Sequence, residues 1–306
     1  MLRVLLTSFL LCLACGAHAN ERIDEVRNYI FGNSLIHHET ASDETTVPHW
    51  LHHLAAAAGK RYGVDGQWGF PHDFIKNLPP IDQWKFKEAQ GVWDEANGPF
   101  DAAPFDTIIM NPANFIQEKA PDEVFRGFGP KDKTPFSITV ELFDWVAKHK
   151  PGLRYFIYEG WSTIGPFTKR FPPNAAGMTA FHEYNRGKYH DWYVKYLQQV
   201  KEARPALDLK LIPVASVMAK MLTQTPLSEL KPHDLYSDMG PHGTNNVYFL
   251  AAVITYSMLY ETKAPASFAP PASLHPLVRA NYRQIADMAC TETLGAAACE
   301  GTAQSR

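Results

Sequence analysis

The stretch that decides the fold is Asn28-Tyr29-Ile30-Phe31-Gly32-Asn33-Ser34-Leu35-Ile36-His37-His38-Glu39, in which an apolar run stops at Gly-Asn-Ser. The apolar residues suit a buried strand, and Gly32 permits a sharp turn. Asn33 and Ser34 then stand where a helix would begin, with backbone N–H groups free to face a ligand. Two interpretations fit this turn. Ser34 is either a nucleophile held beside an incipient oxyanion site or an ordinary helix N-cap.

A second strand meets polar amides in the same way. Residues 105–110 are rich in β-branched and apolar residues, and Asn111-Pro112-Ala113-Asn114 follows at once. Amides at the C-terminal end of a central strand lie where ligands bind in open α/β sheets. A turn before Pro112 explains Asn111, but it explains Asn114 less well.

Strands and helices alternate through the rest of the chain, which predicts a mostly parallel sheet covered on both faces. The pattern predicts strands at residues 154–158 and 209–214. It predicts helices at residues 47–62, 137–148, 184–204, 215–222 and 247–260. Residues 163–177 are rich in Pro and Gly and are interpreted as an insertion near the site. Residues 63–80 carry several Gly and Pro and are expected to form a loop, in which Gly66 could approach an oxyanion.

A late loop supplies the remaining residues of a possible catalytic group. Asp238 and His242 flank Gly240-Pro241, which enforce a turn just before an apolar helix. An Asp that orients a His, with the His free to take a proton from a Ser, is the logic of a catalytic triad. Asp and His are also common in plain turns, so this pair has two interpretations as well.

Taken in order, Gly32-Asn33-Ser34, a glycine loop, an Asn after a strand and a late Asp…His pair resemble the SGNH (GDSL-like) hydrolase family. The resemblance covers residues 28–260. It implies a three-layer α/β/α flavodoxin-like sandwich with a mostly parallel central sheet, and a secreted esterase or acetylesterase. No cofactor and no metal are expected.

The family pattern places its functional residues at definite positions of this sequence. Ser34 matches the nucleophile, His242 the base and Asp238 its orienter. The Ser34 N–H, Gly66 and Asn114 match the oxyanion donors, with Gly69 and Asn111 as alternatives for the last two. The chain departs from the pattern where Asp-Met-Gly-Pro-His is one residue longer than Asp-x-x-His and where Pro112 replaces a glycine.

The two ends of the chain predict export. Residues 1–19 have the positive start, apolar core and Ala-His-Ala site of a signal peptide, and the core is too short to span a bilayer. Cleavage leaves Cys290 and Cys299, whose spacing predicts a local disulfide in a C-terminal tail of residues 262–306. Residues 20–306 are expected to form one domain, periplasmic or secreted.

Charge and aromatic content narrow the choice of partner. A net charge of −3 with mixed signs argues against nucleic acid, and no later stretch predicts membrane insertion. Trp68, Trp161 and His37 are candidate substrate contacts, and a glycan ester, above all an O-acetylated carbohydrate, is the expected substrate. A lipid or aryl esterase and a sugar O-acetyltransferase are alternatives on the same fold.

Two further alternatives belong to other classes of protein. His49 lies one helical turn from His52 and His53, with His37 and His38 nearby in sequence, which would suit a metal-dependent hydrolase. The chain lacks a His-Glu-x-x-His pattern, and histidines are common on the surface of Ala-rich helices. A non-catalytic glycan-binding protein that retains the fold is the other alternative.

Overall fold

The computed structural model describes residues 22–112, 119–124 and 132–300. Its centre is a five-stranded parallel sheet in the order β2-β1-β3-β4-β5. The strands are β1 (Glu25–Gly32), β2 (Arg61–Trp68), β3 (Thr107–Met110), β4 (Arg154–Tyr158) and β5 (Asp208–Ile212). All five run in one direction, so their C-terminal ends meet at a single edge of the sheet.

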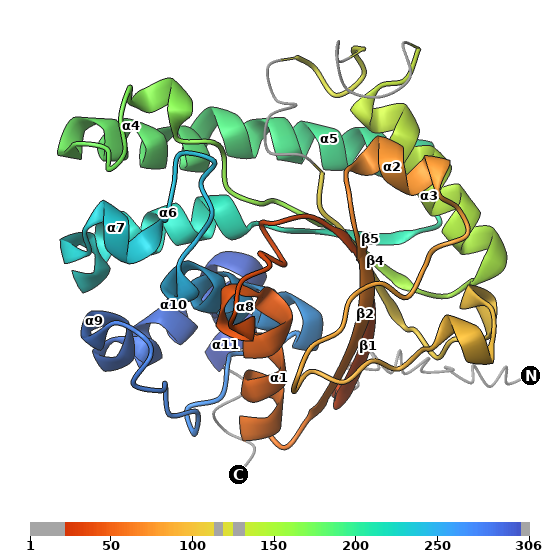
Figure 1. Cartoon of the computed structure of the whole chain (residues 1–306), viewed down its shortest axis with the longest axis horizontal. Coiled ribbons are helices and arrows are strands. Elements are labelled where there is room, and N and C mark those ends of the chain that lie inside the picture. Colours follow the sequence, from red (N-terminus) through yellow and green to blue (C-terminus); the bar gives the residue numbers. More distant parts are fainter. Residues whose placement is uncertain (1–21, 113–118, 125–131, 301–306) are drawn as a thin grey trace, which may run out of the picture.

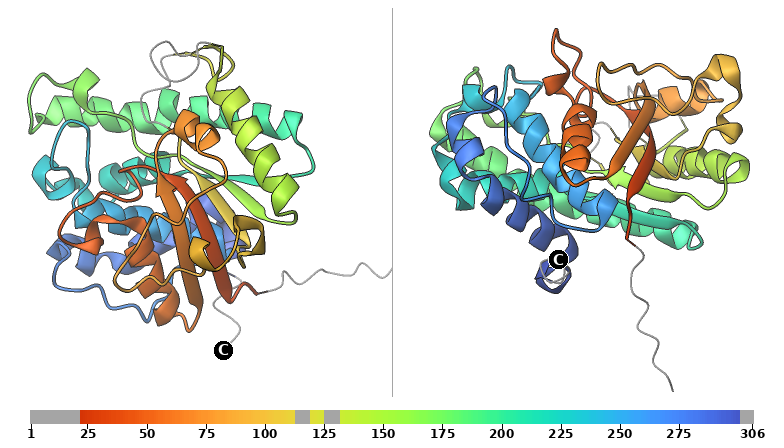
Figure 2. Two further views of the ribbon diagram at one scale, coloured as in Figure 1. Left: turned by 45° about the vertical axis from the view of Figure 1, so that its right-hand side comes forward. Right: turned by 90° about the horizontal axis from the view of Figure 1, so that it is seen from below.

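Helices cover both faces of this sheet, which confirms the predicted three-layer α/β/α sandwich (Figure 1). One layer groups α1 (Val47–Ala57), α6 (Val214–Gln224), α8 (Asn245–Tyr260) and α10 (Tyr282–Leu294). The other groups α2 (Pro71–Lys76), α3 (Pro135–His149) and α5 (His190–Ala203). The remaining α-helices of the described residues are α4 (Ala175–Tyr184), α7 (Pro232–Leu235), α9 (Pro276–Ala280) and α11 (Ala296–Glu300). Figure 2 shows the two layers on opposite sides of the strands. No helix among these is long and apolar enough to cross a membrane.

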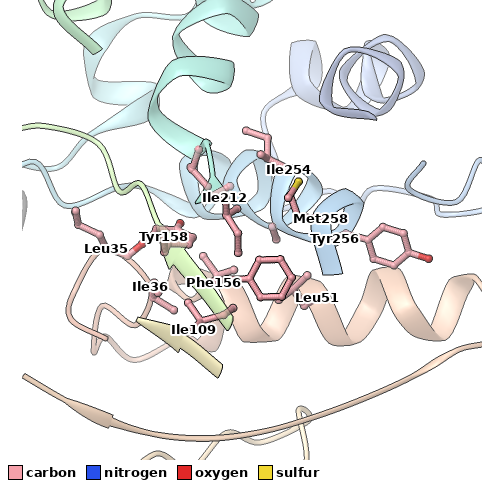
Figure 3. Close-up of a cluster of buried hydrophobic side chains, with 14 of the residues drawn as sticks. Leu35, Ile36, Leu51, Ile109, Phe156, Tyr158, Ile212, Ile254, Tyr256 and Met258 are labelled. Atoms are coloured by element: carbon pink, nitrogen blue, oxygen red, sulfur yellow. Dashed lines mark hydrogen bonds between the residues drawn. The ribbon is translucent and has the colours of Figure 1, made fainter. Parts of the chain in front are cut away.

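The central core lies between the sheet and the layer of α1 and α8. Phe156 and Ile109 point from neighbouring strands toward Leu51 of α1 and Ile254 of α8 (Figure 3). All four side chains are at most 1% exposed. Because α8 is apolar around its whole circumference, it is buried on every side, as a helix of that kind must be.

The prediction for residues 61–68 is wrong, because this segment is strand β2 and not the end of a helix followed by a loop. Its two glycines obscure the usual pattern of a strand. A Cβ at Gly63 would lie 2.3 Å from Val92 Cγ1, and one at Gly66 would lie 2.8 Å from Trp84 Cε3. Glycine is therefore required where the segment that follows packs directly on the strand.

The predicted helix 184–204 also differs from the structure. Only its later part is the regular helix α5, because residue 184 ends α4 and Asn185–Tyr189 form a π-helical segment with non-helical dihedral angles at Gly187. Gly187 lacks a Cβ and tolerates this break, whereas the apolar spacing around it resembles a continuous helix.

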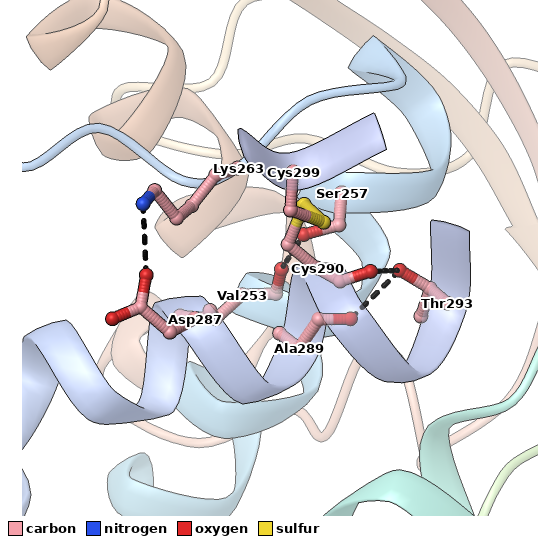
Figure 4. The surroundings of a disulfide bond; sticks show 8 residues. All are labelled: Val253, Ser257, Lys263, Asp287, Ala289, Cys290, Thr293 and Cys299. Atoms are coloured by element: carbon pink, nitrogen blue, oxygen red, sulfur yellow. Dashed lines mark hydrogen bonds and ion pairs between the residues drawn. A yellow bond between two sulfur atoms is a disulfide. The ribbon is translucent and has the colours of Figure 1, made fainter. Parts of the chain in front are cut away.

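The C-terminal segment, which was expected to be a tail, contains helices α9, α10 and α11. Helix α10 packs against α8 and α6, and Cys290 and Cys299 form the predicted disulfide between α10 and α11 (Figure 4). An ion pair of 2.8 Å between Lys263 Nζ and Asp287 Oδ1 lies beside the disulfide.

Replacing both cysteines by serine should lower the free energy of unfolding by about 2–3 kcal/mol, because the disulfide restricts the unfolded chain. Denaturant unfolding measures this loss. Dithiothreitol should shift the midpoint of the parent protein to that of the double variant, which should not respond. A parent midpoint that is the same with and without reductant would contradict the prediction.

Candidate active site

In the turn after β1, Asn33 and not Ser34 accepts the backbone hydrogen bonds. Asn33 Oδ1 accepts a hydrogen bond of 3.1 Å from the Leu35 N–H, and the Asn33 carbonyl accepts from the N–H groups of Ile36 and His37 at 2.9 and 3.0 Å. The segment is a turn, not the start of a helix as expected, and α1 begins only at Val47. Asn33 thus satisfies the local backbone, which leaves the Ser34 side chain for another partner.

That partner is His242, which lies 208 residues away in the sequence. His242 Nε2 is 3.1 Å from Ser34 Oγ, and His242 Nδ1 is 2.6 Å from Asp238 Oδ2. A carboxylate only accepts hydrogen bonds, so His242 must carry its proton on Nδ1. Nε2 is then the acceptor that faces the Ser34 hydroxyl. The structure thus brings together three residues that the sequence places in two distant turns.

The Asp238 carboxylate is held by three donors. Its Oδ1 accepts from the N–H groups of Gly240 at 2.7 Å and His242 at 3.0 Å, in addition to the ring of His242 on Oδ2. Desolvation by burial raises the pKa of Asp238, but these hydrogen bonds outweigh it and leave the pKa lowered. The carboxylate is therefore ionised and fixed, although its side chain is 47% exposed.

The segment after β4 supports the loop of residues 238–242. Trp161 Nε1 donates a hydrogen bond of 2.8 Å to the Pro241 carbonyl, and Thr163 Oγ1 donates one of 3.1 Å to the Met239 carbonyl. Trp161 is only 1% exposed. The prediction that Trp161 contacts substrate is therefore corrected: its indole supports the loop from inside.

Tyr248 of α8 links this loop to the nucleophile turn. Its hydroxyl donates a hydrogen bond of 2.6 Å to the Ser34 carbonyl, and its ring packs edge-on against Trp161 with centroids 5.7 Å apart. The backbone of Ser34 and the loop that carries His242 are thus fixed to the same buried helix.

The two histidines after the turn have different surroundings. His38 stacks on His242, with ring centroids 4.2 Å apart and planes 11° from parallel. Burial, followed by the nearby His242, lowers the pKa of His38, so a neutral ring covers His242. His37 packs against Trp84 and Phe86, and burial lowers its pKa as well. The stacking of His38 on His242 corresponds to no sequence pattern, so the sequence did not predict it.

The candidate oxyanion residues are not all brought together. Gly66 lies inside β2 and pairs with Ile30 of β1, which is four residues before Ser34 in the sequence. The structure therefore does not place Gly66 beside the nucleophile. Gly69 directly follows β2, and its N–H donates a hydrogen bond of 2.8 Å to the Gly32 carbonyl. Asn111 is buried and donates from Nδ2 to Asn33 Oδ1 at 3.1 Å. Asn114 lies outside the described residues.

A cavity of about 350 Å³ opens beside His38 and the loop that carries His242. Most of the residues that line it have polar side chains. The lining residues are His38, Thr40, Ser42, Glu44, Thr45, Ser237, Gly243, Thr244 and Asn245. Trp68, the other predicted aromatic contact, is 43% exposed at the end of β2.

The histidine cluster expected for a metal-dependent hydrolase does not form as predicted. His38 stacks on His242 and His37 packs on Trp84, whereas His49 and His53 face Glu88. In the described part of the chain, His49, His53 and Glu88 are the one group of such residues that could hold a metal ion.

Glu159 is a buried charge that sequence reasoning did not single out. Its Oε2 lies 2.7 Å from His190 Nδ1, and its Oε1 accepts from the Ser216 N–H at 3.0 Å. Burial raises the pKa of Glu159, and the hydrogen bond to Glu159 raises the pKa of His190, so both shifts keep a proton on the pair. Glu159 thus joins the end of β4 to the starts of α5 and α6, directly before the segment that carries Trp161.

No family model matches the sequence of this chain, and no curated protein matches it either. Its structure is similar to a family 3 carbohydrate esterase of Clostridium thermocellum, with 14% identity, a TM-score of 0.42 and coverage of 76% of this chain and 94% of that one. It is also similar to an acetyl xylan esterase from the rumen bacterium Butyrivibrio proteoclasticus, with 12% identity, a TM-score of 0.30 and coverage of 61% and 54%. At these values the likeness assigns no residue roles, which rest on this chain's own geometry.

Glu159→Ala should lower the free energy of unfolding, because the buried Ser216 N–H loses its hydrogen-bond acceptor. This loss alone should cost about 1–3 kcal/mol. Glu159→Gln keeps an acceptor oxygen and the side-chain volume, and should lose clearly less. Urea unfolding of the two variants beside the parent protein measures both values. Equal losses in the two variants would show that the acceptor at this position does not matter.

Proposed function

We propose that the chain is a serine esterase that hydrolyses acyl esters of carbohydrate, above all O-acetyl esters, through an acyl-enzyme on Ser34. The observation that carries the proposal is the chain of hydrogen-bond contacts from Ser34 Oγ through His242 to Asp238. Nucleophile, base and orienting carboxylate stand in the order that acyl transfer requires.

Each step of the reaction has a residue to perform it. His242 Nε2 takes the proton of Ser34 Oγ as that oxygen attacks the ester carbonyl. His242 then returns the proton to the leaving alcohol oxygen as the bond between the acyl carbon and that oxygen breaks. Water, deprotonated by the same nitrogen, attacks the acyl-enzyme and releases the acid and the free Ser34 hydroxyl. Asp238 holds the ring and stabilises the imidazolium between these steps.

The neutral His38 ring contributes to the same steps in this mechanism. Because it lies parallel to His242, it covers one face of the imidazolium without adding a like charge. The oxyanion would be held by the Ser34 N–H and by the Asn114 side chain. Gly66 is not assigned this role, since it lies inside β2.

The cavity beside His38 supports a polar alcohol as the leaving group. Side chains of Thr40, Ser42 and Glu44 offer both donors and acceptors to hydroxyl groups, as a sugar presents them. The exposed ring of Trp68 is proposed as a stacking surface for a sugar, and His37 flanks the site.

Ser34→Ala should reduce hydrolysis of an acetyl ester by about 10³-fold or more, because the variant can form no acyl-enzyme. Asp238→Asn should cost on the order of 10³–10⁴-fold in kcat, because the amide cannot hold the required tautomer of His242. Initial rates with p-nitrophenyl acetate measure both effects. Ser228→Ala, at an exposed serine of a 3₁₀ turn, is the matched control and should retain the parent rate.

Parent turnover in Ser34→Ala would contradict the mechanism. The substrate class is tested separately by comparing acetylated oligosaccharides with esters of longer acyl chains. Higher kcat/KM on the oligosaccharides supports the carbohydrate assignment, whereas higher values on long acyl chains favour a lipid or aryl esterase. Transfer of the acetyl group to added sugar in place of water would favour an O-acetyltransferase.

A further inference from the structure

We propose that His49, His53 and Glu88 form a binding site for one divalent transition-metal cation, with Zn²⁺ as the best match. One ligand atom from each side chain lies within 4.8 Å of the other two. The site shares no residue with Ser34, His242 and Asp238, and none of the proposed steps of ester hydrolysis passes through it.

Helix geometry brings the two imidazoles together. His49 and His53 are four residues apart in α1, so they project from the same face on successive turns. Their ring centroids lie 4.5 Å apart. This spacing is the one by which two histidines of a helix commonly bind a single zinc ion.

The third ligand comes from a segment far from α1 in sequence. Glu88 Oε2 lies 2.7 Å from His53 Nε2 and 3.6 Å from His49 Nδ1. Within the described residues, His49 Nδ1 is a buried nitrogen with no hydrogen-bond partner, and its side chain is only 12% exposed. A buried polar atom without a partner is costly, and a cation bound to its lone pair would satisfy it.

The backbone behind each ligand is fixed. Helix α1 is anchored by Trp50, which is buried and donates from Nε1 to the Glu44 carbonyl at 2.8 Å. On the other side, the Lys87 N–H donates to Asp43 Oδ2 at 2.7 Å, and Ala89 is only 1% exposed. Glu88 thus stands between two anchored neighbours, so little ordering of the backbone opposes metal binding.

The donor set selects the class of metal. Two imidazole nitrogens and one carboxylate oxygen suit Zn²⁺ and its transition-metal neighbours, whereas Ca²⁺ and Mg²⁺ prefer sites made of oxygen. The Glu88 side chain is 51% exposed, which leaves room for water as a fourth ligand. The bound cation would join α1 to the segment whose Trp84 packs on His37, and so brace the nucleophile turn.

Isothermal titration of ZnCl₂ into the metal-free protein should show one site, and Zn²⁺ in hundredfold excess over its Kd should raise Tm by about 5 °C. Mg²⁺ should cause neither effect. His53→Ala and Glu88→Gln should each weaken zinc binding by at least about tenfold and remove the shift in Tm. Circular dichroism of each variant confirms that it is folded before titration.

His52→Ala and His233→Ala are the matched controls, since these histidines lie outside the cluster and should leave zinc affinity unchanged. Zinc binding that survives in both His53→Ala and Glu88→Gln would overturn the proposal. So would the absence of any saturable site in the parent protein, which would leave His53 and Glu88 as an ion pair only. Because the readout is binding, the result does not depend on whether the protein hydrolyses esters.

Discussion

The complete burial of helix α8 is the constraint on which the candidate site depends. Every residue from Asn246 to Tyr260 is buried, so this helix has one place in the molecule, between the sheet and α10. Burial of one large apolar side chain contributes about 1.5–3 kcal/mol, whereas a single hydrogen bond contributes about 0.5–1.5 kcal/mol. Packing of α8 therefore positions the loop before it, and the contact between Ser34 and His242 follows from that packing.

The hydrogen bonds around α8 then refine this position. Tyr248 reaches back to the Ser34 carbonyl, while Trp161 holds the Pro241 carbonyl of the loop that leads into the helix. Both donors are side chains of buried aromatic residues, so their hydroxyl and indole groups act at defined distances. Asp238 needs no deep burial in this arrangement, because backbone N–H groups of its own loop fix the carboxylate.

The sequence predicted the parts of the fold and site that are encoded locally. Strand β4 and helix α8 follow from apolar runs, and Ser34, Asp238 and His242 follow from turns at the ends of such elements. Strand β2 could not be recognised, since Gly63 and Gly66 owe their place to side chains that pack on them from a distant segment.

The prediction that Trp161 contacts substrate was wrong for a related reason. A Trp among Gly and Pro looks the same in sequence whether its ring faces solvent or the interior. The stacking of His38 on His242 and the Glu159–His190 pair join residues that are remote in sequence. Spacing along the chain carries no information on such pairs. What the sequence could not predict was thus the set of long-range contacts.

The most direct test of the account is to label the protein with a fluorophosphonate and to locate the adduct by peptide mass spectrometry. We expect one adduct, on Ser34, which forms about 10³-fold more slowly in His242→Ala. An adduct on a different serine, or labelling of Ser34 at an unchanged rate in His242→Ala, would contradict the claim that His242 activates Ser34.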